Sequence, residues 1–195
     1  MKLIIKIFFV SLIIINNSNS QKINCETYDD YFKKYSKRYF GPTFDWRIFK
    51  AQAFAESNLN PDAVSWVGAK GIMQIMPETY QELKLKNSEL GEINDPHWNI
   101  AAGIHYNRQL WKQWKEKDDL NNKMSFVFGS YNAGSGTIRR AESIAKKESL
   151  DTKQWTSIEK IAPTVPKWRH KETLDYVKKI ENNFQKLQSV KKKKR

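Results

Sequence analysis

Apolar side chains recur every three to four residues along most of the chain, which is the period of a helix with one buried face. In the first such stretch the apolar positions are mainly aromatic, and Gly41-Pro42 ends the pattern. A second helix is expected to start at a cap on Thr43 or Asp45 and to end near Ser57. The aromatic positions of the first stretch are Tyr28, Tyr31, Phe32, Tyr35 and Tyr39.

Proline and glycine divide the rest of the chain. A turn-rich loop is expected over 58–74, followed by a short helix over 77–83. Asp95-Pro96 has the residue types that begin a helix, with Asp95 as the cap and Pro96 in the first turn. Further helices are expected over about 96–114, 123–131, 137–147 and 171–188, with irregular chain over 148–169. The pattern predicts an all-α fold with a small β-hairpin near 63–74 as the only strand structure.

The two ends of the chain have compositions of their own. Residues 1–20 carry lysines, then an apolar run, then a small-polar-small ending, which is typical of a cleaved signal peptide and too short for a spanning helix. A single domain is expected over 21–190, followed by a basic tail at 191–195. Cys25 is the one cysteine, so no internal disulfide is expected. A periplasmic protein with no transmembrane segment in the mature chain is the resulting prediction.

The formal net charge of +13 is compatible with a polyanionic partner, either nucleic acid or the peptide carboxylates of a cell wall. No recognisable nucleic-acid-reading module accompanies the charge, so nucleic acid is not expected as a partner. His97, His105 and His170 are too scattered to form a metal site together with one cysteine. Neither a metal nor a cofactor is expected.

Glu56 is the strongest candidate for a catalytic residue. On a helix it shares a face with Phe49, Gln52 and Ala53, so it leaves the apolar side at the helix end. Burial there favours the protonated acid, and a protonated glutamic acid can act as a general acid. A surface glutamate near a helix end would be the simpler alternative, although a negative charge is unfavourable at that end.

A series of motifs at fixed offsets resembles the catalytic module of the family 1 lytic transglycosylases, the SLT domain with a goose-lysozyme-like fold. The resemblance covers about residues 44–181, and Ile72 replaces the usual leucine. The matching positions are Glu56-Ser57, Pro61, Ser65, Gly68-Ala69, Gly71-Ile72-Met73-Gln74, Met76-Pro77, Thr79, Asn99-Ile100, Gly103, Tyr106, Tyr131-Asn132-Ala133-Gly134, Gly136, Glu172-Thr173 and Tyr176-Val177.

By resemblance Glu56 is the catalytic acid and base, and seven residues contact the substrate. Six of the seven have a simpler alternative: Met73 as core filler, Tyr131 as a packed aromatic, Ser65 as a turn residue, Asn132 as a helix cap, and Glu172 and Tyr176 as ties between helices. One or two of the seven tryptophans could stack on sugar faces, but the sequence does not indicate which. The seven implied substrate-binding residues are Ser65, Met73, Gln74, Tyr131, Asn132, Glu172 and Tyr176.

The resemblance implies cleavage of the MurNAc-GlcNAc β-1,4 bond of peptidoglycan without water, leaving 1,6-anhydroMurNAc ends. Most glycosidases need two carboxylates. One carboxylate suffices here if the substrate's own acetamido oxygen is the nucleophile and its 6-hydroxyl then closes onto C1. Two alternatives stay open: a lysozyme-like muramidase with Asp62 as second carboxylate, and a non-catalytic glycan-binding protein. The expected partners are peptidoglycan glycan strands and envelope or secretion machinery, and the expected state is a monomer.

Overall fold

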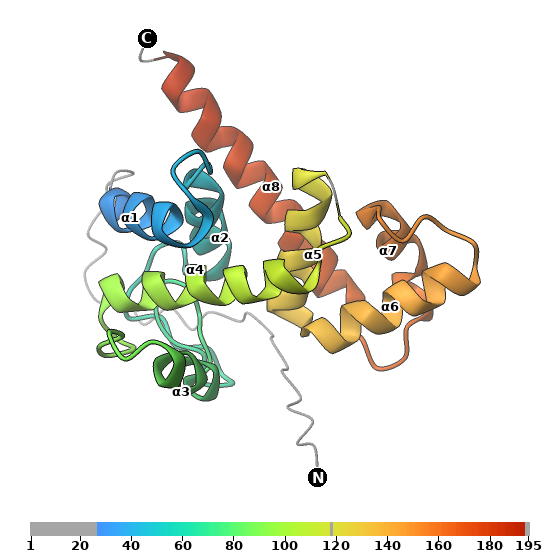
Figure 1. Cartoon of the computed structure of the whole chain (residues 1–195), viewed down its shortest axis with the longest axis horizontal. Helices are drawn as coiled ribbons and strands as arrows, with labels where there is room; N and C mark the ends of the chain where they lie inside the picture. Colours follow the sequence, from blue (N-terminus) through green and yellow to red (C-terminus); the bar gives the residue numbers. More distant parts are fainter. Residues whose placement is uncertain (1–26, 118, 194–195) are drawn as a thin grey trace. The chain divides into compact units, whose positions relative to one another are not determined.

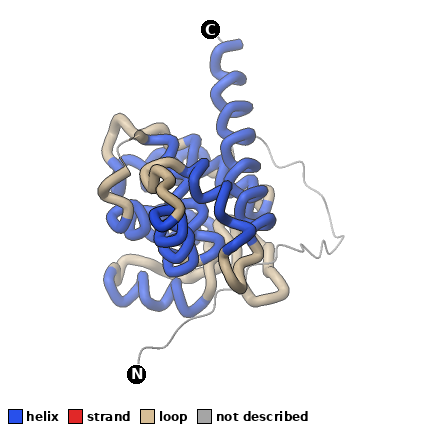
Figure 2. Tube along the Cα trace, turned by 90° about the vertical axis from the view of Figure 1, so that its right-hand side faces the viewer, coloured by secondary structure: helices blue, strands red, loops and turns tan. Residues whose placement is uncertain are grey.

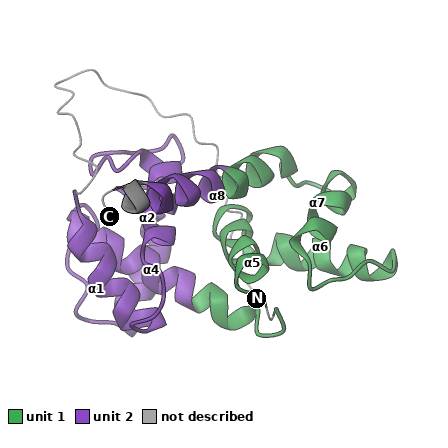
Figure 3. Cartoon of the chain, turned by 90° about the horizontal axis from the view of Figure 1, so that it is seen from above, with its two compact units in different colours: residues 1–9, 109–178 green, residues 10–108, 179–195 purple. Residues whose placement is uncertain are grey.

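The computed structural model describes residues 27–117 and 119–193, and these divide into two compact units. Unit 2 holds the described residues up to Arg108 together with those from Lys179 onward, and unit 1 holds Gln109–Lys178 (Figure 3). The division falls inside two helices, α4 and α8. The predicted signal peptide and Cys25 lie outside the described residues. Among the helices described, none combines the length and the apolar character that crossing a membrane requires.

Helices and loops make up the described residues, which confirms the all-α prediction (Figures 1 and 2). In place of a hairpin, residues 63–75 contain two isolated antiparallel bridges, Val64 with Lys70 and Lys70 with Ile75. The helices are α1 (Asp29–Phe40), α2 (Arg47–Ser57), α3 (Pro77–Lys86), α4 (Pro96–Gln113), α5 (Leu120–Ala133), α6 (Ser135–Lys147), α7 (Trp155–Ile161) and α8 (His170–Lys193), with a 3-10 turn at Ala162–Thr164.

In unit 2 the aromatic stripe of α1 packs inward, with Phe32 and Tyr35 both buried. The buried Lys50 of α2 pairs with Asp29 at the start of α1, which fixes the two helices to each other. The Tyr35 hydroxyl lies 2.6 Å from His97 Nε2 on α4. Burial raises the pKa of Tyr35 to about 12, and burial with the nearby Lys34 lowers the pKa of His97. The short contact between the phenol and the imidazole holds α1 against α4.

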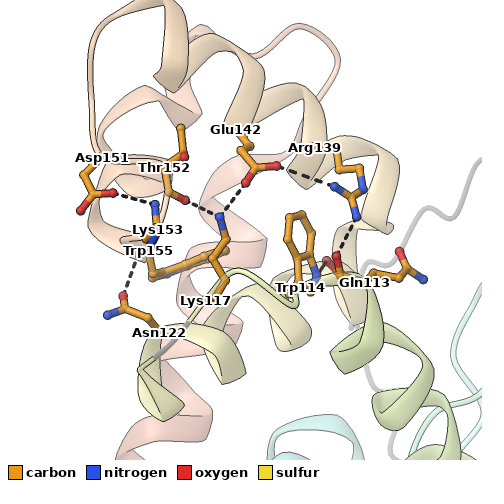
Figure 4. A network of polar contacts seen from close by, with 11 residues as sticks. Gln113, Trp114, Lys117, Asn122, Arg139, Glu142, Asp151, Thr152, Lys153 and Trp155 are labelled. Carbon is orange, nitrogen blue, oxygen red and sulfur yellow. Dashed lines mark hydrogen bonds and ion pairs between the residues drawn. The ribbon is translucent and has the colours of Figure 1, made fainter.

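Unit 1 is held together by a buried lysine (Figure 4). Lys117 Nζ donates to Glu142 Oε1 on α6 at 2.6 Å and to the carbonyl of Thr152 at 2.6 Å, and it lies 4.5 Å from the centre of the Phe126 ring. Three segments distant in sequence thus converge on one ammonium group. Asn122 Oδ1 accepts the backbone N–H of Trp155, which attaches the start of α7 to α5.

Several predicted boundaries need correction. The irregular stretch predicted for 148–169 contains α7, whose side chains Trp155, Ile158 and Ile161 are buried. Helix α5 begins at Leu120 because Asp119 accepts the backbone N–H of Asn122, a cap that the sequence analysis overlooked. Helix α6 begins at Ser135 directly after Gly134, and α8 continues to Lys193, so the first residues of the predicted basic tail are helical. Asp95 does cap α4, since its Oδ1 accepts the N–H of His97 at 2.8 Å.

Candidate active site

Glu56 lies in the last turn of α2 and is 7% exposed, so the sequence-based prediction of a buried carboxyl at this helix end is confirmed. The helix ends at Asn58, which adopts the left-handed conformation (φ 55°). Within unit 2, Lys179 of α8 donates to the carbonyl of Ala55 at 2.9 Å. A cation on the last carbonyls of a helix is favourable, and here it offsets the cost of placing an acid at the same end.

The helix that carries Glu56 is also fixed from the side of α4. Gln52, one turn before Glu56, accepts from Asn107 Nδ2 at 2.7 Å, and both side chains are fully buried. A buried amide pair of this kind restricts the rotation of α2 about its own axis, because rotation would break the bond between the two amides away from water. The direction in which the last turn of α2 points is therefore set by polar contacts as well as by packing.

The loop after α2 folds back so that Ile72 contacts Ser57, the residue after Glu56. Ser57 Oγ donates to the carbonyl of Ile72 at 2.9 Å, in a buried contact between residues fifteen positions apart. Within the loop, Leu59 and Gln74 have positive φ values of 63° and 46°. Residues other than glycine rarely adopt a positive φ, because each such residue costs about 1–3 kcal/mol of backbone strain. Residues strained in this way concentrate at functional sites.

Gln74 presents its amide oxygen rather than its amide nitrogen. Its Nε2 donates to the carbonyls of Ala63 at 3.0 Å and of Gly71 at 2.9 Å, which uses both amide hydrogens. The oxygen has no protein hydrogen-bond donor among the described residues. The side chain is 6% exposed. A ligand at this point would therefore have to supply a donor, such as a hydroxyl or an amide N–H.

Two residues of α4, one turn apart, hold Met73. Asn99 Oδ1 accepts the backbone N–H of Met73 at 2.8 Å, while its Nδ2 donates to the carbonyls of Lys70 and Ile93, both at 3.0 Å. Gly103 makes room for the Met73 side chain, since a Cβ there would lie 2.7 Å from Met73 Cβ and Cγ. Met73 is 0% exposed. In this structure it fills the space beneath the loop, and the neighbouring Gln74 is positioned through it.

Ser65 occupies the turn of the loop. Its Oγ accepts the N–H of Ala69 at 2.9 Å, and its backbone carbonyl accepts the N–H of Gly68 at 2.9 Å. Gly68 has a φ of 89°, a conformation that glycine adopts without strain. The Ser65 hydroxyl is thus a turn-stabilising acceptor here, and its own proton remains available to a ligand.

The candidate residues of unit 1 gather around the end of α5. Tyr131 is 3% exposed, and Asn132 Oδ1 accepts from Thr173 Oγ1 at 2.8 Å. The Thr173 hydroxyl in turn accepts from Trp168 Nε1 at 3.0 Å. The relay from Trp168 through Thr173 sets the orientation of the Asn132 amide, with its nitrogen directed away from Thr173. Asn132 therefore contacts α8 rather than capping α5, where Gly134 ends the helix.

Glu172 lies in the first turn of α8, a favourable place for a negative charge. Its carboxylate oxygens are buried and accept no hydrogen bond within the described part of the chain. Its pKa is raised by burial and lowered in part by Arg169, whose Nε lies 3.4 Å away. Tyr176, one turn further along the helix, is 9% exposed. If Glu172 only linked helices, its carboxylate would accept a hydrogen bond from another helix. Among the described residues it accepts none, and its ion pair is with Arg169, three positions away.

The candidate residues fall into two groups. Glu56, Ser65, Met73 and Gln74 belong to unit 2, where helix α2 and the following loop hold them, and Tyr131, Asn132, Glu172 and Tyr176 belong to unit 1. Asp62 is exposed on the loop surface. The described residues contain no cluster of histidine, cysteine and carboxylate side chains suited to a metal ion. The sequence contains no local signal for the supporting roles of Asn99 and Thr173, because only the folded chain brings them to their partners.

A family model described as the transglycosylase SLT domain matches residues 30–154. The chain belongs to this family. A membrane-bound lytic murein transglycosylase F of Desulfosudis oleivorans is 32% identical over 62% of this chain and 25% of its own length. The same-named protein of Photobacterium profundum is 28% identical over 82% of this chain and 31% of its own.

The fold agrees with a solved SLT structure. The 70 kDa soluble lytic transglycosylase of Escherichia coli superposes with a TM-score of 0.62 at 28% identity, over 82% of this chain and 24% of that one. This SLT chain therefore spans between a quarter and a third of the length of the curated relatives it matches. The shared part is the helical module described above.

Proposed function

We propose that this SLT chain is a lytic transglycosylase that cleaves the MurNAc-GlcNAc β-1,4 bond of peptidoglycan. The observation that carries the proposal is the burial of one acid. Among the residues whose exposure the structure describes, Glu56 is the only aspartate or glutamate that is buried as a whole residue. Glu56 lies beside a loop that contains residues with positive φ values. The family to which the chain belongs is named for transglycosylases.

The proposed reaction uses Glu56 twice. As a protonated acid, which burial favours, Glu56 donates its proton to the glycosidic oxygen, and the bond from that oxygen to C1 of MurNAc breaks. The acetamido oxygen of the same sugar bonds to C1 in its place. The Glu56 carboxylate then removes the proton of the 6-hydroxyl, whose oxygen displaces the acetamido oxygen from C1. The product is a 1,6-anhydro ring, no water is consumed, and the acid is regenerated.

The other candidate residues are assigned to binding. The Gln74 amide oxygen would accept from a sugar hydroxyl or an acetamido N–H, since its nitrogen is already committed to Ala63 and Gly71. Asn132 would present its amide nitrogen to a substrate oxygen, because Thr173 occupies its oxygen. Ser65, Tyr131, Glu172 and Tyr176 complete the proposed set by family resemblance. Met73 belongs to the set by the same resemblance, and since it is 0% exposed it would act from beneath the loop that carries Gln74. We place the reaction in the periplasm, with glycan strands as the partner.

Mass spectrometry of the fragments released from purified peptidoglycan tests the proposal. Wild type, Glu56→Gln and the exposed control Glu78→Gln are compared. Wild type and Glu78→Gln should release muropeptides with anhydro ends, lighter by one water than hydrolysis products, and Glu56→Gln should release none. Hydrated reducing ends would show a muramidase instead. Release of nothing by any of the three would refute catalysis and favour a glycan-binding protein.

A further inference from the structure

Trp66 is set apart from the other tryptophans by its exposure. The chain has seven tryptophans, and all of them lie within the described residues. Trp66 is the only exposed one among them, at 59%. Trp114, Trp155 and Trp168 are buried in unit 1, and the others are at least half covered. Val64, two residues before Trp66, is also 59% exposed. Two large apolar side chains therefore face water at one turn of unit 2.

The turn that carries Trp66 is fixed in shape. Ser65–Gly68 form a β-turn closed by the Gly68 N–H on the Ser65 carbonyl at 2.9 Å, with Trp66 in the second position. Ser65 N–H donates to the Ala69 carbonyl at 2.9 Å, and Ser65 Oγ accepts from the Ala69 N–H. Because the backbone is already ordered, a ligand that binds the indole need not bear the entropic cost of ordering this turn.

The same turn continues directly into the candidate active site. The carbonyl of Ala63 accepts both the Gly71 N–H at 2.8 Å and Gln74 Nε2 at 3.0 Å, so the base of the turn is in contact with a proposed substrate-binding residue. Trp66 is three positions after Ala63, which places the two Cα atoms at most about 11 Å apart. The exposed indole therefore lies beside the substrate-binding loop, on the element that holds Gln74.

We propose that Trp66 is a glycan-binding residue, on whose indole face a sugar ring of the strand stacks beyond the bond that is cleaved. One face of a pyranose ring presents C–H groups, and a flat aromatic surface with a polar N–H edge suits such a ring. Isolated exposed apolar residues are common on protein surfaces. Trp66 differs from these because it adjoins Val64, stands on a rigid turn and borders the site. The inference rests on the proposed function for the identity of the ligand.

Binding is measured with intact insoluble peptidoglycan in a co-sedimentation assay, using the full chain in the Glu56→Gln background to prevent turnover. Trp66→Ala should weaken binding about tenfold, the factor that corresponds to a contact worth about 1.4 kcal/mol. Trp66→Tyr should restore most of it, because an aromatic face returns. The control Leu85→Ala, which removes an 88% exposed apolar side chain from α3, should bind like the parent.

Kinetics separate this inference from the proposed function. In the active chain, Trp66→Ala should raise KM for anhydro-product release and leave the melting temperature unchanged, since the removed side chain is exposed. If wild type forms anhydro ends but Trp66→Ala has unchanged KM and unchanged binding, the inference is wrong and the function stands. If wild type forms none, sedimentation still decides whether Trp66 binds the glycan. Loss of binding in Leu85→Ala as well would indicate nonspecific adhesion and overturn the inference.

Discussion

Removal of the Asn99 amide should destabilise the chain and disable the loop that it supports. In Asn99→Ala the Met73 N–H loses its partner in a fully buried place, which costs about 1–3 kcal/mol. The Lys70 carbonyl keeps a bond from the Ile75 N–H at 3.0 Å, and the Ile93 carbonyl is on a partly exposed residue, so these two together add about 1–2 kcal/mol. The expected loss of unfolding free energy is therefore about 2–5 kcal/mol.

Urea unfolding followed by circular dichroism measures this loss, with Asn87→Ala as the control. Asn87 also makes two side-chain hydrogen bonds, to the Tyr39 hydroxyl in a partly buried place and from the exposed Glu89 N–H, and neither is fully buried like the bond from the Met73 N–H. The control should lose less than about 1 kcal/mol. If the two variants lose the same amount, Asn99 does not hold the loop, and the argument from its three hydrogen bonds is wrong.

Three further outcomes are expected. Glu56→Gln should abolish anhydro-product formation with an unchanged or higher melting temperature, because glutamine keeps the shape and cannot ionise at a residue that is 7% exposed; a large drop would mean that Glu56 is structural. Lys117→Met should cost about 1–3 kcal/mol, because among the described residues Glu142 keeps only its 3.8 Å pair with Arg139 and the Thr152 carbonyl loses its donor, and Lys117→Met with Glu142→Leu should recover part of the loss; a double variant no more stable than the single one would refute this. Because burial raises the pKa of Glu172 above its ordinary value of 4.5, the folded state binds the proton more tightly, and stability should fall as pH rises through that raised pKa. Glu172→Gln should remove this fall in urea titrations between pH 4 and 7, and an unchanged pH profile would contradict it.

Local signals explain why most helices could be predicted from the sequence. The start of α4 depends on Asp95 and on Pro96, whose preferences act within one turn, and the structure has the expected bond from the His97 N–H. Helix α7 was missed because Pro163 and Pro166 follow it closely and made the whole stretch look irregular. Its buried positions Trp155, Ile158 and Ile161 nevertheless follow a helical period, so the signal was present but short.

The candidate site was predictable in part for the same reason. The burial of Glu56 follows from its place on the apolar face of α2, a local property. The family motif marked Asn99 and Gly103 but gave no reason for them. The contact from Asn99 to Met73 spans twenty-six positions and depends on how α4 packs under the loop, which no local pattern contains. The exposure of Trp66 is likewise a property of the folded turn.

The loop conformation itself shows that these distant contacts are required. Leu59 and Gln74 both adopt positive φ values, at about 1–3 kcal/mol each, so an isolated segment 58–76 would relax to a different shape. The fold must therefore impose the shape, and the contacts that do so include Ser57 on Ile72, Asn99 on Met73 and Lys70, and Gly103 against the Met73 side chain. Each acts on the segment between Lys70 and Met73, directly before Gln74. The geometry of Gln74 therefore depends on Ser57, Asn99 and Gly103, which are outside the proposed binding set, so substitutions at these positions should change catalysis without removing any proposed binding group.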